Sequence, residues 1–181
     1  MEDERIIVRS AIPSDAAFAD QIIQEMESSA VARGSGISKR SASSVIEKMN
    51  AGKAIVAVTE NGEWVGFSYI ETWDDGKFVS NSGLIVSPRH RNQGVASQIK
   101  TRVFELARTK YPQAKIFSIT SGLAIMKMNT RLGFEPVTYA EVAQEPRFWD
   151  CCKSCVNYNV LQSKNRCNCL CTAMLFDPKL N

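Results

Sequence analysis

Short apolar runs alternate along this chain with longer segments in which apolar residues lie three or four positions apart. The short runs are rich in strand-forming residues and occupy residues 5–9, 53–59, 63–71, 77–86, 115–120, 136–139 and 170–176. The longer segments follow Pro13, Ser38 and Gly94 and fill residues 123–132, with the spacing of helices that bury one face. The order β-α-α-β-β-β-α-β-α-β-β predicts an α/β (mixed α+β) fold with helices packed on a central, mostly antiparallel mixed sheet.

Polar and glycine residues mark the ends of these elements. Ser14 or Asp15 is positioned to cap the first helix, and Ser38 the second. Residues 28–37 contain two glycines and little periodicity, so we expect a loop there. Asn61-Gly62 between two apolar runs predicts a β-hairpin, because both residues tolerate positive φ.

The rest of the chain is organised around residues 83–107. An apolar strand ends at Ser87-Pro88, a basic turn follows, and helical spacing starts at Val95. The first N–H groups of a helix have no intrahelical acceptor and carry the positive end of the helix dipole, so they can bind a phosphate. Arg89 and Arg91 add positive charge, while Gly94 lets an oxygen approach the backbone. The alternative is an ordinary strand-turn-helix with solvated arginines.

The detail of this stretch favours the phosphate site. Val86, Pro88, Arg91, Gly94 and Ala96 form the pattern V-x-P-x-x-R-x-x-G-x-A. This resembles the acetyl-CoA signature R/Q-x-x-G-x-G/A of the GNAT family of N-acetyltransferases. The sequence LGFEPV at residues 132–137 also fits that family in order and spacing. The resemblance covers roughly residues 6–137 and extends less securely to the strand at 170–176.

The resemblance implies a GNAT-like acyl-CoA N-acyltransferase fold in one domain, residues 1–181, with a Cys-rich insertion at 141–171 before the last strand. It implies that the pantetheine arm of acetyl-CoA pairs with the fourth strand and that the diphosphate binds the N–H groups at 91–97. The cofactor-binding residues expected on this basis are Leu84, Ile85, Val86, Arg89, Arg91, Asn92, Gln93, Gly94, Val95, Ala96, Ser97 and Asn129.

Acetyl transfer to an amine needs a neutral amine, a polarised thioester carbonyl and a proton for the leaving thiolate. The backbone N–H of Val86 is a candidate to polarise the carbonyl. Glu71, at the end of the third strand, is the candidate base. One alternative is that Glu71 is only a solvated carboxylate at a strand end; another is that a chain of water molecules takes the place of a single base. Many family members carry a tyrosine as acid where this chain has Asn129, which can hydrogen-bond the sulfur but cannot protonate it. Tyr139 or Tyr158 could supply the proton, or the thiolate leaves unaided.

All six cysteines lie between residues 151 and 171. Cys152-x-x-Cys155 and Cys169-x-Cys171 are two short chelating pairs, which makes Cys152, Cys155, Cys169 and Cys171 a candidate zinc site. Cys169 and Cys171 also fall on the predicted last strand, where both would face one side as small buried hydrophobes. Packed thiols and redox-active pairs therefore remain alternatives to zinc.

Composition and charge set bounds on the function. A net charge of +3 is too small to indicate nucleic-acid binding. No apolar run approaches the roughly 20 residues that span a bilayer, so we expect no membrane partner. The start, MEDERIIV, is acidic and then strand-like, which does not resemble a signal peptide and favours a cytoplasmic protein.

The sequence therefore predicts an acetyl-CoA-dependent N-acetyltransferase that acts on a small-molecule amine or an amino acid, such as glutamate, by direct transfer in a ternary complex. A protein N-terminal or lysine acetyltransferase is an alternative. A non-catalytic CoA-binding or zinc-stabilised interaction module is another, because Asn129 replaces the usual acid. The insertion at 141–171 would either cover the acceptor site or form a homodimer surface. Its basic residues, such as Lys164 and Arg166, would suit an acidic acceptor.

Overall fold

The computed structural model describes residues 5–181. The first four residues, on which the expectation of no signal peptide partly depends, lie outside this range. Seven strands form one mixed sheet in the order β1-β2-β3-β4-β5-β7-β6. β4 and β5 are parallel, and the β1–β2, β2–β3, β5–β7 and β6–β7 pairs are antiparallel. The mixed α/β fold with a mainly antiparallel sheet is therefore confirmed.

Contacts along the chain define two compact units, each of which is described separately. Of the described residues, unit 1 comprises 5–28, 40–70 and 81–106, and unit 2 comprises 29–39, 71–80 and 107–181. Strands β3 (Trp64–Trp73) and β4 (Phe78–Val86) contribute residues to both units.

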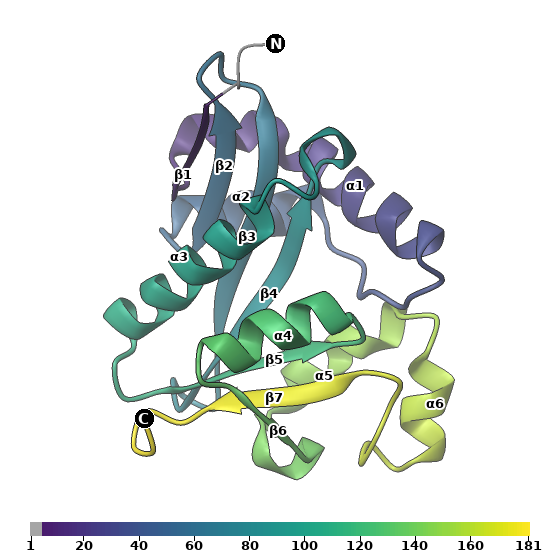
Figure 1. Cartoon of the computed structure of the whole chain (residues 1–181). Helices are drawn as coiled ribbons and strands as arrows, with labels where there is room; N and C mark the ends of the chain where they lie inside the picture. The colour runs from purple at the N-terminus through teal and green to yellow at the C-terminus, as the bar shows by residue number, and fades with distance from the viewer. Residues whose placement is uncertain (1–4) are drawn as a thin grey trace. The chain divides into compact units, whose positions relative to one another are not determined.

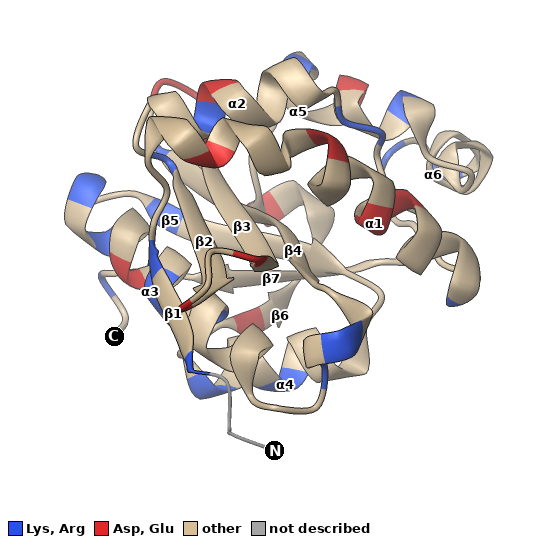
Figure 2. Ribbon diagram, turned by 90° about the horizontal axis from the view of Figure 1, so that it is seen from above, with Lys and Arg blue, Asp and Glu red and all other residues tan. Residues whose placement is uncertain are grey.

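In unit 1, β1 (Ile6–Ser10) pairs with β2 (Ala54–Thr59), and β2 pairs with β3. All six residues of β2 are buried, because helices cover both faces of the sheet here. α3 (Val95–Lys110) lies on one face, and α1 (Ala19–Ala32) and α2 (Ala42–Asn50) lie on the other (Figure 1). Both signs of charge occur on α2 and α3 (Figure 2).

Two boundaries in this region differ from those predicted. Residues 28–32, predicted as loop, continue α1, because Ile22, Met26 and Ala30 are all buried at four-residue spacing and extend its apolar face. The N-cap of α2 is Ser41 instead of Ser38, and its hydroxyl accepts a hydrogen bond from the Ser44 N–H at 3.2 Å.

Unit 2 is built on β5 (Lys115–Thr120), β7 (Thr172–Phe176) and β6 (Glu135–Val137). α4 (Leu123–Arg131) packs beside β5, and Gly133 follows it with φ +87°, as expected for a residue that ends a helix. The insertion at 141–171 contains α5 (Pro146–Asp150), a 3₁₀ turn (Cys151–Ser154) and α6 (Tyr158–Ser163), drawn in yellow-green in Figure 1. It is therefore a helical insertion.

The insertion packs against neighbouring strands of unit 2 and forms a hydrophobic core with them. We call this core the aromatic cluster; its buried members are Trp73, Phe117, Tyr139, Val142, Ala143, Trp149, Leu161 and Ala173. Phe148 packs edge-to-face on both Phe117 and Trp149, with ring centroids 5.1 and 4.9 Å apart. Within residues 5–181, no helix is long and apolar enough to cross a bilayer.

Candidate functional site

The predicted acyl-donor strand, β4, has an irregularity near its middle. Gly83 has φ +66°, and a Cβ atom there would come within 2.7 Å of Tyr69 Cε1 and 2.9 Å of Met26 Cε. Only glycine tolerates this positive φ and also leaves room for the neighbouring side chains. We therefore describe Gly83 as a local bend in the strand. The parallel register with β5 covers Phe78–Ser80 against Lys115–Phe117, and residues 81–86 of β4 lie beyond it. This is the part of β4 that contains Leu84, Ile85 and Val86, as the pantetheine prediction requires.

The chain then turns from β4 into α3 through the segment 87–94, which we call the β4–α3 loop. A 3₁₀ turn (Pro88–His90) comes first. Ser87 precedes it as the N-cap residue, and the Ser87 hydroxyl is 2.7 Å from His90 Nδ1. Asn92 and Gly94 both have positive φ, +62° and +77°. A Cβ on Gly94 would meet no atom within 4 Å, so glycine is needed there for backbone conformation and not for space.

The loop leads directly into the first turn of α3, whose N–H groups are the predicted anion donors. The Gln98 N–H donates to the Gly94 carbonyl at 3.2 Å and closes the first helical turn. The N–H groups of Val95, Ala96 and Ser97 therefore have no intrahelical acceptor. Val95 is buried and anchors the helix, while Ser97 is exposed. The donor set fits the diphosphate of a nucleotide-containing cofactor.

The two arginines of the loop have different surroundings. Arg91 donates from Nε to the Val86 carbonyl at 3.1 Å and forms an ion pair from Nη2 to Glu25 at 2.7 Å. Arg91 therefore ties the loop to β4 and α1, which a simple anion-binding role did not predict. Arg89 lies 3.6 Å from Glu63, but its side chain is 73% exposed, so this pair is weak and Arg89 remains accessible to an anion. Gln93 donates to the Arg89 carbonyl at 3.3 Å.

A depression of about 540 Å³ lies beside the loop in unit 1. Its lining residues are Phe18, Gln21, Glu63, Trp64, Ser87, Pro88, Arg89 and His90. The predicted sequence of strand, basic turn and helix is confirmed. The assignment of its residues to acetyl-CoA binding remains a prediction.

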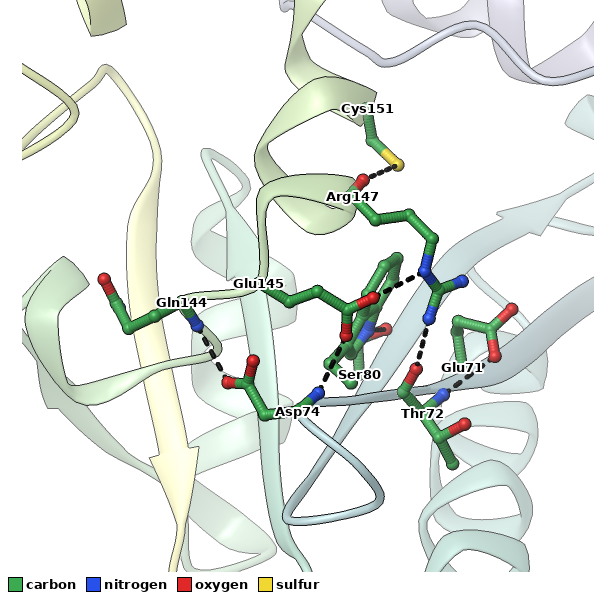
Figure 3. Close-up of polar contacts among 9 residues, drawn as sticks. Glu71, Thr72, Asp74, Ser80, Gln144, Glu145, Arg147 and Cys151 are labelled. Carbon is green, nitrogen blue, oxygen red and sulfur yellow. Dashed lines mark hydrogen bonds and ion pairs between the residues drawn. The ribbon is translucent and has the colours of Figure 1, made fainter.

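Glu71, the candidate base, lies in unit 2 near the end of β3 (Figure 3). It is 9% exposed, and its Oε1 accepts a hydrogen bond from the Thr72 N–H at 2.9 Å. The insertion reaches the same strand end through Arg147, which donates to the Thr72 carbonyl at 3.0 Å and packs over the Trp73 ring, 4.4 Å from its centroid. Sequence reasoning did not single out Arg147.

Glu145 holds Arg147 and the β3–β4 turn together. Its Oε1 accepts from Arg147 Nε at 2.7 Å, and its Oε2 accepts from the Asp74 N–H at 2.8 Å (Figure 3). Asp74 in turn accepts from the Gln144 N–H at 2.9 Å. The hydrogen bond from Arg147 holds the pKa of Glu145 below its usual range, and the same bond raises the pKa of Arg147. A charged, half-exposed guanidinium therefore lies in the same polar cluster as Glu71.

Asn129 occupies the last turn of α4 and is fully buried in unit 2. Its Nδ2 contacts Met174 Sδ at 3.6 Å, and its Oδ1 has no hydrogen-bond partner among the described residues. A buried amide oxygen without a donor is unfavourable, so this atom suits a ligand that brings an N–H or O–H.

Tyr139 follows β6 and is buried in the aromatic cluster of unit 2. Its hydroxyl donates to the Cys171 carbonyl at 2.7 Å, and burial raises its pKa. A phenol in this state gives up its proton reluctantly, so its clearest contribution here is to tie the cluster to the chain before β7.

The zinc prediction is not supported. Among residues 5–181, no group of three or more His, Cys, Asp or Glu side chains is arranged to hold a metal ion. Cys169 and Cys171 precede β7, which starts at Thr172, so they do not share a strand face as predicted. Cys152 and Cys169 pack against the aromatic cluster, and burial raises the pKa of Cys152 and of Cys171 to about 11. Cys152 and Cys169 therefore fill space beside an apolar core, which suits packed thiols.

The comparisons with known proteins agree with this architecture. The model of the acetyltransferase (GNAT) family matches residues 22–134, more than half of the chain. The chain therefore belongs to the GNAT acetyltransferase family. No curated protein sequence matches the chain.

Solved structures show the same fold at low sequence identity. N-acetylglutamate synthase from Neisseria gonorrhoeae, complexed with coenzyme A and N-acetyl-glutamate, has a TM-score of 0.67 and 14% identity; the match covers 97% of this chain. This chain spans only 36% of that enzyme's length. Rv2747 from Mycobacterium tuberculosis, in complex with CoA, has a TM-score of 0.64 and 18% identity, with 94% and 98% of the two chains covered. YncA of Salmonella typhimurium, a putative acetyltransferase with its cofactor acetyl-CoA, has a TM-score of 0.62 and 18% identity, over 96% and 94%.

Proposed function

We propose that this protein is an acetyl-CoA-dependent N-acetyltransferase that acetylates the primary amine of a small molecule or amino acid. The start of α3 carries the proposal. Three N–H groups without intrahelical acceptors follow a loop whose conformation is set by positive φ at Asn92 and Gly94. The family membership supports the same assignment.

The chain's own groups supply most of what the transfer needs. Acetyl-CoA, when bound, brings a thioester as the acyl donor. The N–H groups of 95–97 hold the diphosphate, and the polar backbone of Leu84, Ile85 and Val86 aligns the arm as an added strand would. The Val86 N–H donates to the thioester oxygen as negative charge develops there, which lowers the barrier because the donor is already in place.

Glu71 is the proposed base. Near pH 7 most alkyl amines are protonated, and the Glu71 carboxylate accepts a proton directly or through water to free the amine lone pair. The nitrogen then forms the new N–C bond as the C–S bond breaks. The thiolate takes its proton from water, because Tyr139 is committed to the Cys171 carbonyl and Asn129 cannot supply one.

An amino acid is the acceptor class best matched by the polar cluster. Glu71 would face the ammonium group, and Arg147, whose side chain is 58% exposed, would bind a carboxylate. The structural similarity to a glutamate-acetylating enzyme points in the same direction, so glutamate is the first acceptor to test.

Two measurements test the proposal. Calorimetric titration with CoA and acetyl-CoA should show saturable binding at one site. A thiol-release assay over a panel of amines, with glutamate and other amino acids included, should show acceptor-dependent release. Binding without release across the panel would instead support a non-catalytic CoA-binding module, which the replacement of the usual acid by Asn129 favours. No binding of either ligand would refute both functions.

A further inference from the structure

A buried tryptophan of unit 1 carries a hydrogen-bond donor that the fold does not use. Trp64, the first residue of β3, is 4% exposed, and its Nε1–H has no acceptor among the described residues. A buried indole N–H usually finds a partner, because one without an acceptor has lost its hydrogen bond to water and gained none in return. Trp64 therefore has a donor to spare for a ligand.

The other two tryptophans, both in unit 2, do have acceptors. Trp73 Nε1 donates to the Ser80 hydroxyl at 2.9 Å, and Trp149 Nε1 donates to the Ala143 carbonyl at 3.1 Å. The chain contains three tryptophans. The unused donor is therefore specific to the surroundings of Trp64, and the other two serve as internal references for it.

Trp64 lines the depression of about 540 Å³ beside the β4–α3 loop. All the lining residues belong to unit 1, and Arg89 is the one lining residue that is also a predicted acetyl-CoA residue. The volume lies within the range of about 300–1,000 Å³ that small-molecule sites occupy. The depression is therefore large enough for a small ligand and is separate from the predicted diphosphate site at the start of α3.

The other lining residues indicate the chemistry of such a ligand. Phe18 is half-buried and Pro88 is exposed, so both offer apolar surface. Arg89 offers a positive charge, because its pair with Glu63 is 3.6 Å long and both side chains are more than half exposed, at 73% and 60%. Trp64 Nε1 is also shielded from water, so side chains at the rim must move before a ligand reaches it. The weak pair between Arg89 and Glu63 allows that movement at little cost.

We infer that this depression binds a small carboxylate with an apolar body. The carboxylate pairs with the Arg89 guanidinium and accepts the Trp64 Nε1–H, while the apolar body lies against Phe18 and Pro88. A phosphate dianion fits less well, because the arginine is opposed by the Glu63 carboxylate and apolar surface contributes nothing to binding an inorganic ion. The inference goes beyond the proposed acetyltransferase function and does not depend on it.

The decisive experiment follows the indole N–H signals of the full chain by ¹H–¹⁵N NMR during titration with hydrocinnamate at neutral pH. The signals are assigned from the three single Trp→Phe variants. The Trp64 signal should move downfield and saturate with a dissociation constant of about 0.1–1 mM, while those of Trp73 and Trp149 stay in place. The neutral amide of hydrocinnamate and inorganic phosphate should each bind at least about 10-fold more weakly, because each lacks one of the two features that the site recognises.

Two variants should change the affinity in opposite directions. Trp64→Phe keeps an aromatic ring but removes the donor, so the affinity for hydrocinnamate should fall about 10-fold, the usual effect of losing a hydrogen bond to a charged group. Glu63→Gln removes the carboxylate that competes for Arg89, so the affinity should rise about 2- to 5-fold. Trp149→Phe is the matched control: it makes the same change in size and removes an N–H that has a partner, so it should lower the melting temperature and leave the affinity unchanged.

Four results would overturn the inference: no saturable binding of hydrocinnamate below about 10 mM, binding that leaves the Trp64 signal in place, equal binding of the neutral amide or of phosphate, and weaker binding by Glu63→Gln. If Trp64→Phe does not fold, the titration of the wild type still decides the matter. Calorimetry with CoA remains the separate test of the proposed function, and either test can fail without the other.

Discussion

The β4–α3 region of unit 1 and the aromatic cluster of unit 2 differ in how their polar groups are satisfied. In the aromatic cluster, the buried donors have partners within the protein: the Tyr139 hydroxyl donates to the Cys171 carbonyl, and Trp149 Nε1 donates to the Ala143 carbonyl at 3.1 Å. In the β4–α3 region, the side-chain amide of Asn81 has no hydrogen-bond partner among the described residues, and the first N–H groups of α3 have no intrahelical acceptor. The aromatic cluster therefore completes a core, whereas the β4–α3 region has unsatisfied groups, and our proposal of a ligand site at α3 depends on those of the helix.

This difference teaches how to separate a functional feature from a conspicuous one. The six cysteines are the most unusual feature of the sequence, yet two of them are exposed, four are partly buried, and they form no metal-binding arrangement in the described residues. The buried groups that do lack partners belong to ordinary residue types. We therefore base the proposed ligand site on unsatisfied hydrogen-bonding capacity and not on unusual composition.

The largest expected effect comes from placing charge at the start of α3. Gly94→Glu puts a carboxylate where the diphosphate should bind and forces a side chain into φ +77°, so CoA binding should fall by 1,000-fold or become undetectable by calorimetry. Gly62→Glu is the matched control, because Gly62 has φ +84° and equally open surroundings but lies in the hairpin turn. Equal loss of binding in both variants would show that strain alone explains the result.

The next largest effect tests whether the polar cluster next to the insertion is also catalytic. Glu71→Gln keeps the acceptor oxygen for the Thr72 N–H but removes the base, so kcat should fall about 10²- to 10⁴-fold with CoA affinity unchanged. Glu145→Gln removes a carboxylate from the same cluster and should cost much less activity. Steady-state kinetics that show the same decrease for both variants would indicate a general charge effect and remove Glu71 from its role.

A third prediction concerns Lys100, a buried residue of α3, and its effect on the free energy of unfolding. Lys100 is 3% exposed, and burial lowers its pKa to about 7. Between pH 7 and about 10.5 the unfolded chain binds a proton that the folded chain does not, so the free energy of unfolding should rise with pH across this window. Below pH 7 the full penalty of the buried charge remains.

Lys100→Met removes that penalty. We expect it to raise the free energy of unfolding at pH 6 by roughly 2–5 kcal/mol and to flatten its dependence between pH 7 and 10.5. Urea denaturation at several pH values measures both. An unchanged pH slope in the variant would mean that Lys100 remains protonated in the folded protein at alkaline pH.

A smaller effect is expected from Tyr139→Phe, which tests whether the aromatic cluster is only structural. Loss of the hydrogen bond to the Cys171 carbonyl should lower the free energy of unfolding by about 1 kcal/mol. Because we assign the proton on the leaving thiolate to water, kcat should stay within 3-fold of the wild type. A 100-fold decrease in kcat with intact CoA binding would restore Tyr139 as the acid.

The smallest effect is expected from the thiols. Cys151 and Cys167 are exposed, whereas Cys152 and Cys171, with pKa values of about 11, remain protonated at neutral pH. Mass spectrometry after brief alkylation at pH 7.5 should find label on the exposed pair well before the partly buried pair, Cys152 and Cys171. Early labelling of Cys152 or Cys171 would contradict their packed state and revive the redox alternative.

The sequence predicted most of the fold because its local signals agreed with its tertiary structure. The β5 strand falls on the predicted residues, and the helix that follows Gly94 starts at Val95 as its change of period indicated. The end of α1 and the cap of α2 were misplaced, since Ala30 and Ser41 are decided by packing and geometry that periodicity does not resolve.

The candidate site was predicted less completely. An isolated glycine inside a strand pattern could have signalled the bend at Gly83. Arg147 could not have been found in this way, because its position at the end of β3 depends on a contact across more than seventy residues.

By itself, the sequence determined the order of the elements, the class of the fold and the strand-turn-helix of residues 83–107, because each depends on residues close together in the chain. Tertiary structure alone decided which polar groups are satisfied. A hydrogen bond between distant residues, such as Tyr139 with the Cys171 carbonyl, or its absence at Asn81, is set by what packing brings within 3 Å, and no local pattern encodes that.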